Sequence, residues 1–175
     1  MQISARAEYA IQAMTCLAAS DGDPVTRNAI SDAQRIPQKF LELILGQLRR
    51  AGLVTSTRGM TGGYSLRTPA DRISLADIVR AVDGPLALIR GLPPEETEYP
   101  EPTQGLRTVW VALRSSVRTV LESITLEQLA TDRLPESVIA LSENPGAWLV
   151  SSASPGLRRG EAGQSPARAH SLGEA

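Results

Sequence analysis

The chain has 175 residues, of which 42% are hydrophobic, and its formal net charge is −1. This length suits one ordinary domain or a small domain with an extension, and the composition is typical of a globular protein. No apolar stretch is long enough to span a bilayer and none near the N-terminus resembles a secretion signal, which predicts a cytoplasmic protein with no membrane segment. The single cysteine, Cys16, and the single histidine, His170, exclude a disulfide framework and a His/Cys zinc site within one chain.

The near-neutral net charge conceals an uneven distribution along the chain. Residues 1–84 carry 10 basic and 8 acidic residues, whereas residues 85–150 carry 5 basic and 9 acidic residues. Any attraction to an anionic partner must therefore come from local clusters of basic side chains, because the total charge does not supply it.

The first part of the chain has the periodicity of three helices. Ser4 can cap a helix over residues 5–19, and Thr26 can cap a shorter helix after the turn sequence DGDP. A third helix is expected to begin near Pro37 and to stop at Gly52. Its inward-facing residues are expected to be Phe40, Leu41, Ile44, Leu45 and Leu48.

A hairpin and a fourth helix are expected to follow. The short stretches LVTS and YSLRT flank a glycine-rich segment in which Gly62 and Gly63 are adjacent, a pattern typical of a β-hairpin. Ser74 can then cap a helix with Asp77 as its capping-box partner, and Gly84 can end that helix.

This order of elements predicts a mainly α fold with a small β-hairpin wing, which is a winged helix-turn-helix. The second helix of a helix-turn-helix unit enters the major groove of DNA. Glycines at the tip of the wing would allow positive φ and a close approach to a phosphate. Arg58, at the shoulder of the wing, could reach phosphates or the minor groove.

The face of the third helix that is opposite the core carries the side chains expected to read bases. Gln38 could pair with adenine, Lys39 with guanine or a phosphate, and Glu42 with cytosine. Such polar residues can equally be a solvated helix face, and wings also occur in domains that bind protein. The residues predicted to contact DNA are Thr26, Arg27, Gln38, Lys39, Phe40, Glu42, Arg49, Arg50, Arg58, Gly62, Gly63 and Tyr64.

Beyond the winged domain, assigned to residues 1–84, the sequence divides into four further parts. Residues 85–103 are rich in proline and glutamate and are expected to form an acidic loop. Residues 104–133 are assigned to a long helix and a short following helix, and residues 134–150 to a C-terminal extension. Residues 151–175 are Ser, Gly, Ala, Pro and Arg in the main, which predicts a disordered tail.

An apolar stripe along the long helix predicts a homodimer. Its members recur at alternating steps of three and four, as in a coiled-coil seam, although the stripe could instead pack on its own winged domain. Two DNA-reading heads must address half-sites about one helical turn apart, which favours dimerisation. The stripe consists of Leu106, Val109, Trp110, Leu113, Val117, Val120, Leu121 and Ile124.

Four segments in order, SARAEYAIQAM, IPQKFLELILGQLRRAGLV, RGMTGGYSL and ISLADIVRAVDGP, resemble the Rrf2 family of bacterial winged-helix transcription regulators, which includes IscR, NsrR and CymR. The resemblance continues through ITLEQLA and covers roughly residues 1–132. It implies a homodimer that binds palindromic promoter sites. It also implies base and phosphate contacts by Gln38, Lys39, Phe40 and Glu42, and a minor-groove contact by Arg58.

The sequence departs from that family at the cofactor site. Many members ligate an iron–sulfur cluster through three cysteines in the loop before the long helix, and the loop here, GLPPEETEYPEPTQG, has neither cysteine nor histidine. Cluster ligation requires thiolates or imidazoles, so we expect a member without a metal or cofactor. Glu8 takes the position where some members supply a carboxylate, and Gln12 stands where a redox-sensing branch has histidine. We expect Cys16 to be a buried, inert thiol, with redox sensing as the alternative.

The sequence thus predicts a bacterial transcription regulator rather than an enzyme: a homodimeric repressor that binds a palindromic operator in double-stranded DNA. One alternative is the same regulator gated by a small-molecule effector in a pocket lined by Glu8, Tyr9 and Gln12, between the acidic loop and the first helix. Another is a winged-helix module that binds protein and has no operator. No nucleophile–base pair or phosphate loop supports catalysis.

Overall fold

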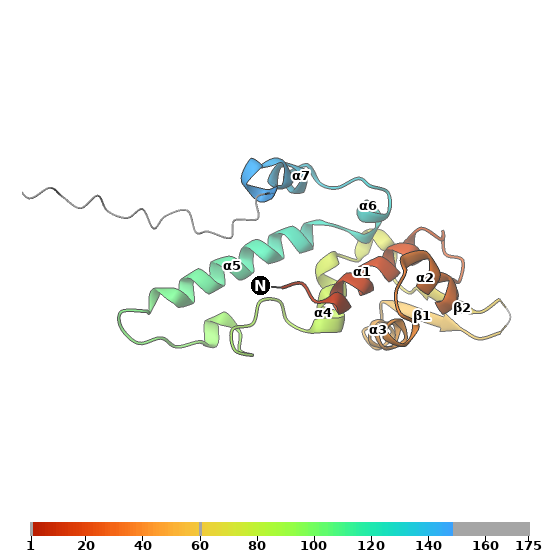
Figure 1. Ribbon diagram of the computed structural model, residues 1–175, viewed down its shortest axis with the longest axis horizontal. Helices are drawn as coiled ribbons and strands as arrows, with labels where there is room; N and C mark the ends of the chain where they lie inside the picture. Colours follow the sequence, from red (N-terminus) through yellow and green to blue (C-terminus); the bar gives the residue numbers. More distant parts are fainter. Residues whose placement is uncertain (1, 60, 149–175) are drawn as a thin grey trace, which may run out of the picture.

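The computed structural model describes residues 2–59 and 61–148, and Figure 1 shows a helical domain with a hairpin at one end and a long helix reaching out at the other. The predicted tail, residues 151–175, lies outside the described residues. The first part of the chain consists of α1 (Ala5–Ala18), α2 (Arg27–Gln34), α3 (Gln38–Arg50), β1 (Val54–Thr57), β2 (Gly63–Leu66), the 3-10 turn η1 (Ala70–Arg72) and α4 (Leu75–Asp83). The second part consists of η2 (Pro94–Glu96), α5 (Gly105–Ser123), α6 (Leu126–Ala130), α7 (Glu136–Glu143) and η3 (Pro145–Trp148).

The predicted helix starts are confirmed by their side-chain caps. The Ser4 hydroxyl accepts a hydrogen bond from the backbone of Ala7, and Thr26 caps α2 in the same way. Ser74 and Asp77 form the expected capping box at the start of α4. Each cap satisfies backbone N–H groups that have no partner inside the helix, which defines where the helix begins.

The core is built from one face of each of the first four helices. Met14, Ile30 and Ile44 are fully buried at its centre, and α1 contacts α2, α3 and α4. Phe40 is only partly buried; its ring meets Tyr9 edge-on with 5.6 Å between ring centroids. The α3 residues that are completely enclosed are Leu41, Ile44, Leu45 and Leu48.

The wing is a two-stranded antiparallel sheet that is anchored on the segment before α2. Val54 pairs with Leu66 and Thr57 with Gly63. Tyr64 and Val25 also exchange backbone hydrogen bonds of 2.9 and 2.8 Å, which attach β2 to the residue just before the α2 cap.

Gly63 serves this attachment, whereas Gly62 lies against the backbone of its own hairpin. The positive φ expected of glycines in the wing is found at Gly59 and not at the adjacent pair. In the described part of the wing, positive φ occurs at Gly59, at 115°. A Cβ on Gly63 would lie 2.6 Å from the carbonyl oxygen of Val25, and one on Gly62 would collide with the backbone of Thr57. Both positions therefore require glycine because backbone crosses backbone there, within the chain itself.

Gly63→Ala is accordingly expected to lower the free energy of unfolding by about 1–3 kcal/mol, the usual cost of forcing extra atoms into a filled space. Urea denaturation followed by circular dichroism measures the effect. Gly46→Ala is the control, because a Cβ there meets only the Arg50 side chain at 3.7 Å in mid-helix. That substitution should stabilise the chain by roughly 1 kcal/mol. Equal stability of the two variants would contradict the packing role of Gly63.

The short helix α6 belongs to the winged domain, although the sequence suggested that it accompanies the long helix. The backbone N–H of Leu126 donates to Ile73 at 2.8 Å, and that of Leu75 donates to Ile124 at 3.0 Å. Leu126 is fully buried and α6 packs on α1. The chain therefore leaves the domain after α4 and returns to it after α5.

This return divides the predicted apolar stripe of α5 into two parts. Ile124 lies beyond the helix in extended backbone and is 6% exposed in the core, so its assignment to a dimer seam is wrong. Val120 and Leu121 also pack against that core. At the other end, Val109 is 54% and Leu113 40% exposed, with Leu106 and Trp110 partly covered.

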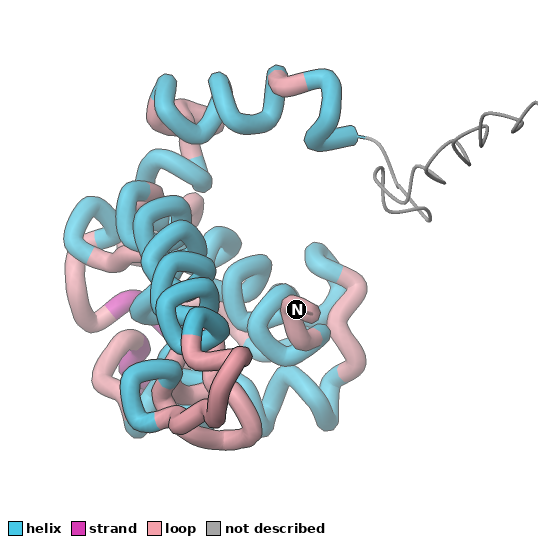
Figure 2. The backbone as a smooth tube through the Cα atoms, turned by 90° about the vertical axis from the view of Figure 1, so that its left-hand side faces the viewer, coloured by secondary structure: helices cyan, strands magenta, loops and turns pink. Residues whose placement is uncertain are grey.

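The acidic loop and the C-terminal extension complete the described chain. The loop contains η2, which packs on α5, and it buries Pro94 and Thr97. The extension contains α7 and η3, at the upper edge of the view in Figure 2, and α7 has no buried residue. Among the helices described, none is both long and apolar enough to cross a membrane.

Candidate nucleic-acid interface

The outer face of α3 is available to a partner. Gln38, Lys39 and Glu42 are exposed beside Leu43, which is 65% exposed, whereas the opposite face is enclosed in the core. In Figure 1, α3 is seen end-on beside the hairpin, and the tip of the hairpin points away from α5. A protruding helix flanked by a wing is the arrangement that a winged helix-turn-helix uses to address one groove and its adjacent backbone.

An ion pair within the helix-turn-helix involves two of the predicted contact residues. The Arg27 guanidinium on α2 lies 2.9 Å from the Glu42 carboxylate on α3, and both side chains are partly exposed. The pair ties the two helices together and reduces the positive charge that Arg27 could offer to a phosphate. Thr26, the α2 cap, is exposed at the same end of that helix.

The basic residues at the end of α3 and on the wing form a second group. Arg49 donates to the Ser56 hydroxyl at 3.4 Å, which links the end of α3 to β1. Arg50 and Arg58 are exposed. Together with Lys39 they place four cationic side chains along α3 and the wing, which is the local clustering that the total charge conceals.

Several predicted contact residues also have structural roles. Phe40 packs on Tyr9, so its ring supports the α1–α3 contact. Tyr64 is partly buried against the core, and Gly62 and Gly63 face backbone of their own chain. Gln47, a further polar residue of α3, is partly buried, and its amide donates to the carbonyl of Val82 at 3.3 Å. These five positions support the interface from within the domain.

The predicted effector residues do not line the hollow that lies beside the start of α1. Glu8 is exposed, Tyr9 faces α3 through Phe40, and the buried Oε1 of Gln12 has no hydrogen-bond partner among the described residues. The hollow of about 330 Å³ between the start of α1, α4 and the segment after it is lined by other residues. Its walls include Ser4, Ala7, Val79, Leu88, Val117 and Leu121.

Cys16 is a half-buried thiol that packs against the core. Burial raises the pKa of Cys16, which lowers the fraction of reactive thiolate at neutral pH. Its surroundings are those of a structural cysteine.

Comparison with known proteins decides the family. A family model described as Rrf2, iron-dependent transcriptional regulator, matches residues 3–132. The chain belongs to the Rrf2 family. Rv1287 of Mycobacterium tuberculosis, provisionally named an HTH-type transcriptional regulator, is 46% identical over 145 residues, covering 82% of this chain and 90% of that protein. The HTH-type transcriptional regulator CymR of Bacillus subtilis is 37% identical over 132 residues, covering 75% of this chain and 91% of CymR.

Solved Rrf2 structures confirm the winged-helix fold. The structure of CymR, described as the global cysteine regulator of B. subtilis, matches with a TM-score of 0.64 at 33% identity, covering 75% of this chain and 98% of that one. IscR of T. potens matches with a TM-score of 0.61 at 32% identity, covering 75% of this chain and 88% of that one. This Rrf2 protein is therefore a DNA-binding transcription regulator.

The iron in the family's description does not fit the side chains of this member. Within residues 2–59 and 61–148, no three His, Cys, Asp or Glu side chains are grouped so that they could hold a metal ion. The loop that precedes α5 has no thiol or imidazole, and the single thiol lies on α1 against the core. Iron–sulfur clusters require several thiolate or imidazole ligands, so this chain lacks the donors.

Proposed function

We propose that this Rrf2 protein is a homodimeric repressor that binds a palindromic operator through α3 and the wing. The observation that carries the proposal is the exposed face of α3, with Gln38 and Lys39 beside a wing that bears Arg58. Side chains of these types read base edges and hold phosphates, and the wing lies where it can reach the flanking backbone.

Glu42 is assigned a different part in recognition. Its carboxylate pairs with Arg27 of α2 at 2.9 Å and carries a negative charge that repels phosphates in its neighbourhood. We assign it to selectivity between operators, with Lys39, Arg49, Arg50 and Arg58 supplying the attraction.

The exposed end of α5 supports the dimer. Val109 and Leu113 present apolar surface on a helix that reaches away from the winged domain (Figure 1). A two-fold pairing of such helices would carry two α3 helices to two half-sites, and the operator would then have matching symmetry.

Selection of bound fragments from randomised double-stranded DNA tests the proposal. The purified protein should enrich an inverted repeat with half-site centres about 10 base pairs, or a multiple of that, apart. Affinity for that repeat should fall steeply with salt, because neutralised phosphates release counterions. Placing the repeat over a promoter should reduce transcription in vitro when the protein is added. Failure to enrich any sequence would instead favour a winged-helix module that binds protein.

A further inference from the structure

A hollow lined by three arginines lies where α4 meets α5. Its volume is about 450 Å³. Arg80 comes from α4, Arg114 and Arg118 come from α5, and the chain that leaves α4 closes one side. The complete lining is Arg80, Gly84, Pro85, Leu86, Arg114 and Arg118, with no carboxylate among them.

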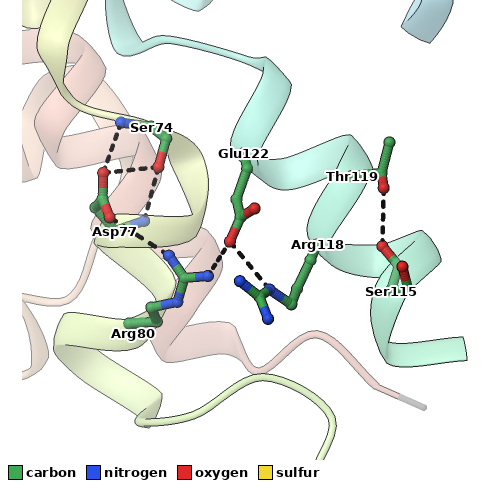
Figure 3. A network of polar contacts seen from close by, with 7 residues as sticks. All are labelled: Ser74, Asp77, Arg80, Ser115, Arg118, Thr119 and Glu122. Atoms are coloured by element: carbon green, nitrogen blue, oxygen red, sulfur yellow. Dashed lines mark hydrogen bonds and ion pairs between the residues drawn. The ribbon is translucent and has the colours of Figure 1, made fainter. Parts of the chain in front are cut away.

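The acids that partner these arginines lie around the hollow rather than in its lining. A single oxygen of Glu122 accepts from both Arg80 and Arg118, the latter at 3.1 Å, as Figure 3 shows. These hydrogen bonds hold the pKa of Glu122 below its ordinary value, so the carboxylate is ionised at neutral pH. Arg80 also lies 3.5 Å from Asp77, within the capping box of α4.

The guanidinium groups keep donors that these pairs do not use. Arg118 contacts Glu122 through Nε, and its two terminal nitrogens make no hydrogen bond to the described residues. Arg114 contacts Glu95 of η2 at 2.6 Å through one terminal nitrogen, and its side chain is only 20% exposed. A guanidinium can hold a carboxylate or phosphate through two parallel hydrogen bonds, so the remaining donors suit a further oxyanion.

We propose that this hollow binds a small metabolite that carries two or more negative charges on carboxylate or phosphate oxygens. Arg114 and Arg118 hold it from α5, and Arg80 holds it from α4. The ligand competes with Glu122 for Arg80 and Arg118 and so replaces the direct tie between the two helices. The regulatory importance of this ligand rests on the proposed function, in which α4 belongs to the DNA-binding domain and α5 carries the dimer surface.

Binding of citrate and of inorganic phosphate, measured by titration calorimetry on the full chain without DNA at constant ionic strength, tests the site. At least one should bind saturably with one molecule per chain. Arg114→Gln and Arg118→Gln should each weaken binding about tenfold, because each removes a charge-assisted hydrogen bond. Glu122→Gln should tighten binding about threefold or more, because it removes the negative charge that competes with the ligand for Arg80 and Arg118. Arg107→Gln, on the same helix outside the hollow, should bind like the parent.

The outcomes distinguish failure of the anion site from failure of the proposed function. A variant with both Lys39→Ala and Arg58→Ala should lose operator binding and keep the anion site. The site is wrong if neither anion binds, if Glu122→Gln weakens binding, or if the Arg107→Gln variant loses as much as Arg118→Gln. If the site regulates DNA binding, the anion that binds should change the operator affinity of the parent more than that of Arg118→Gln. An equal change in both proteins would contradict a regulatory role.

Discussion

Replacing Val109 and Leu113 together by aspartate is expected to yield a folded monomer that no longer binds its operator tightly. Both side chains are exposed on the outer end of α5 and contribute nothing to the core. Buried carboxylates facing one another across a two-fold axis would oppose association. Loss of the second reading head should weaken operator binding by about 100-fold or more, the scale of avidity that linked sites provide.

Sedimentation equilibrium measures the oligomeric state, and circular dichroism shows whether the variant is folded. An electrophoretic mobility shift measures the affinity for the operator. Thr108→Asp combined with Ser115→Asp is the matched control, since it adds the same charge on the opposite, exposed face of α5. Val117 is avoided because it lines the hollow against α1 and α4, where a charge would disturb the fold. A parent protein that sediments as a monomer at micromolar concentration would refute the dimer. A double-aspartate variant that remains dimeric would show that the outer end of α5 is not the dimer interface.

Lys39→Ala and Arg58→Ala are each expected to weaken operator binding by about 1–3 kcal/mol where the contact is to a base. If the contact is to a phosphate, the affinity should fall by the same factor for all DNA sequences. The slope of log affinity against log salt concentration should then be smaller by about one. Both side chains are exposed and neither forms an ion pair with the described residues, so the fold should not change.

The measurement is a binding isotherm at several salt concentrations, on the selected operator and on unrelated DNA. Arg133→Ala, an exposed arginine just beyond α6, provides the control for removal of one positive charge elsewhere. If both Lys39→Ala and Arg58→Ala bind like the parent at moderate salt, then α3 and the wing do not dock on DNA as proposed.

The helix starts could be predicted from the sequence because each depends on a few neighbouring residues. Ser4, Thr26 and Ser74 cap their helices, and Thr125 forms a capping box with Gln128, because the hydroxyl oxygen and the N–H that it accepts from are three residues apart. The order of the helices and the hairpin could be predicted from similarly local patterns of apolar, capping and glycine residues. That order was enough to recognise a winged helix-turn-helix.

The partners of apolar and glycine residues were decided only by the tertiary structure. Helical spacing of apolar residues indicates which face of a helix is apolar, but it does not indicate what that face packs against. The return of the chain after α5 brings Ile124 and Leu121 onto the core of the winged domain. Gly63 is required because Val25, remote in sequence, crosses it at van der Waals distance. Spacing along a chain specifies which side chains share a face, whereas the approach of a distant segment depends on how all the elements pack. The fold class was therefore determined by the sequence alone, and the division of α5 between core and exposed surface by packing.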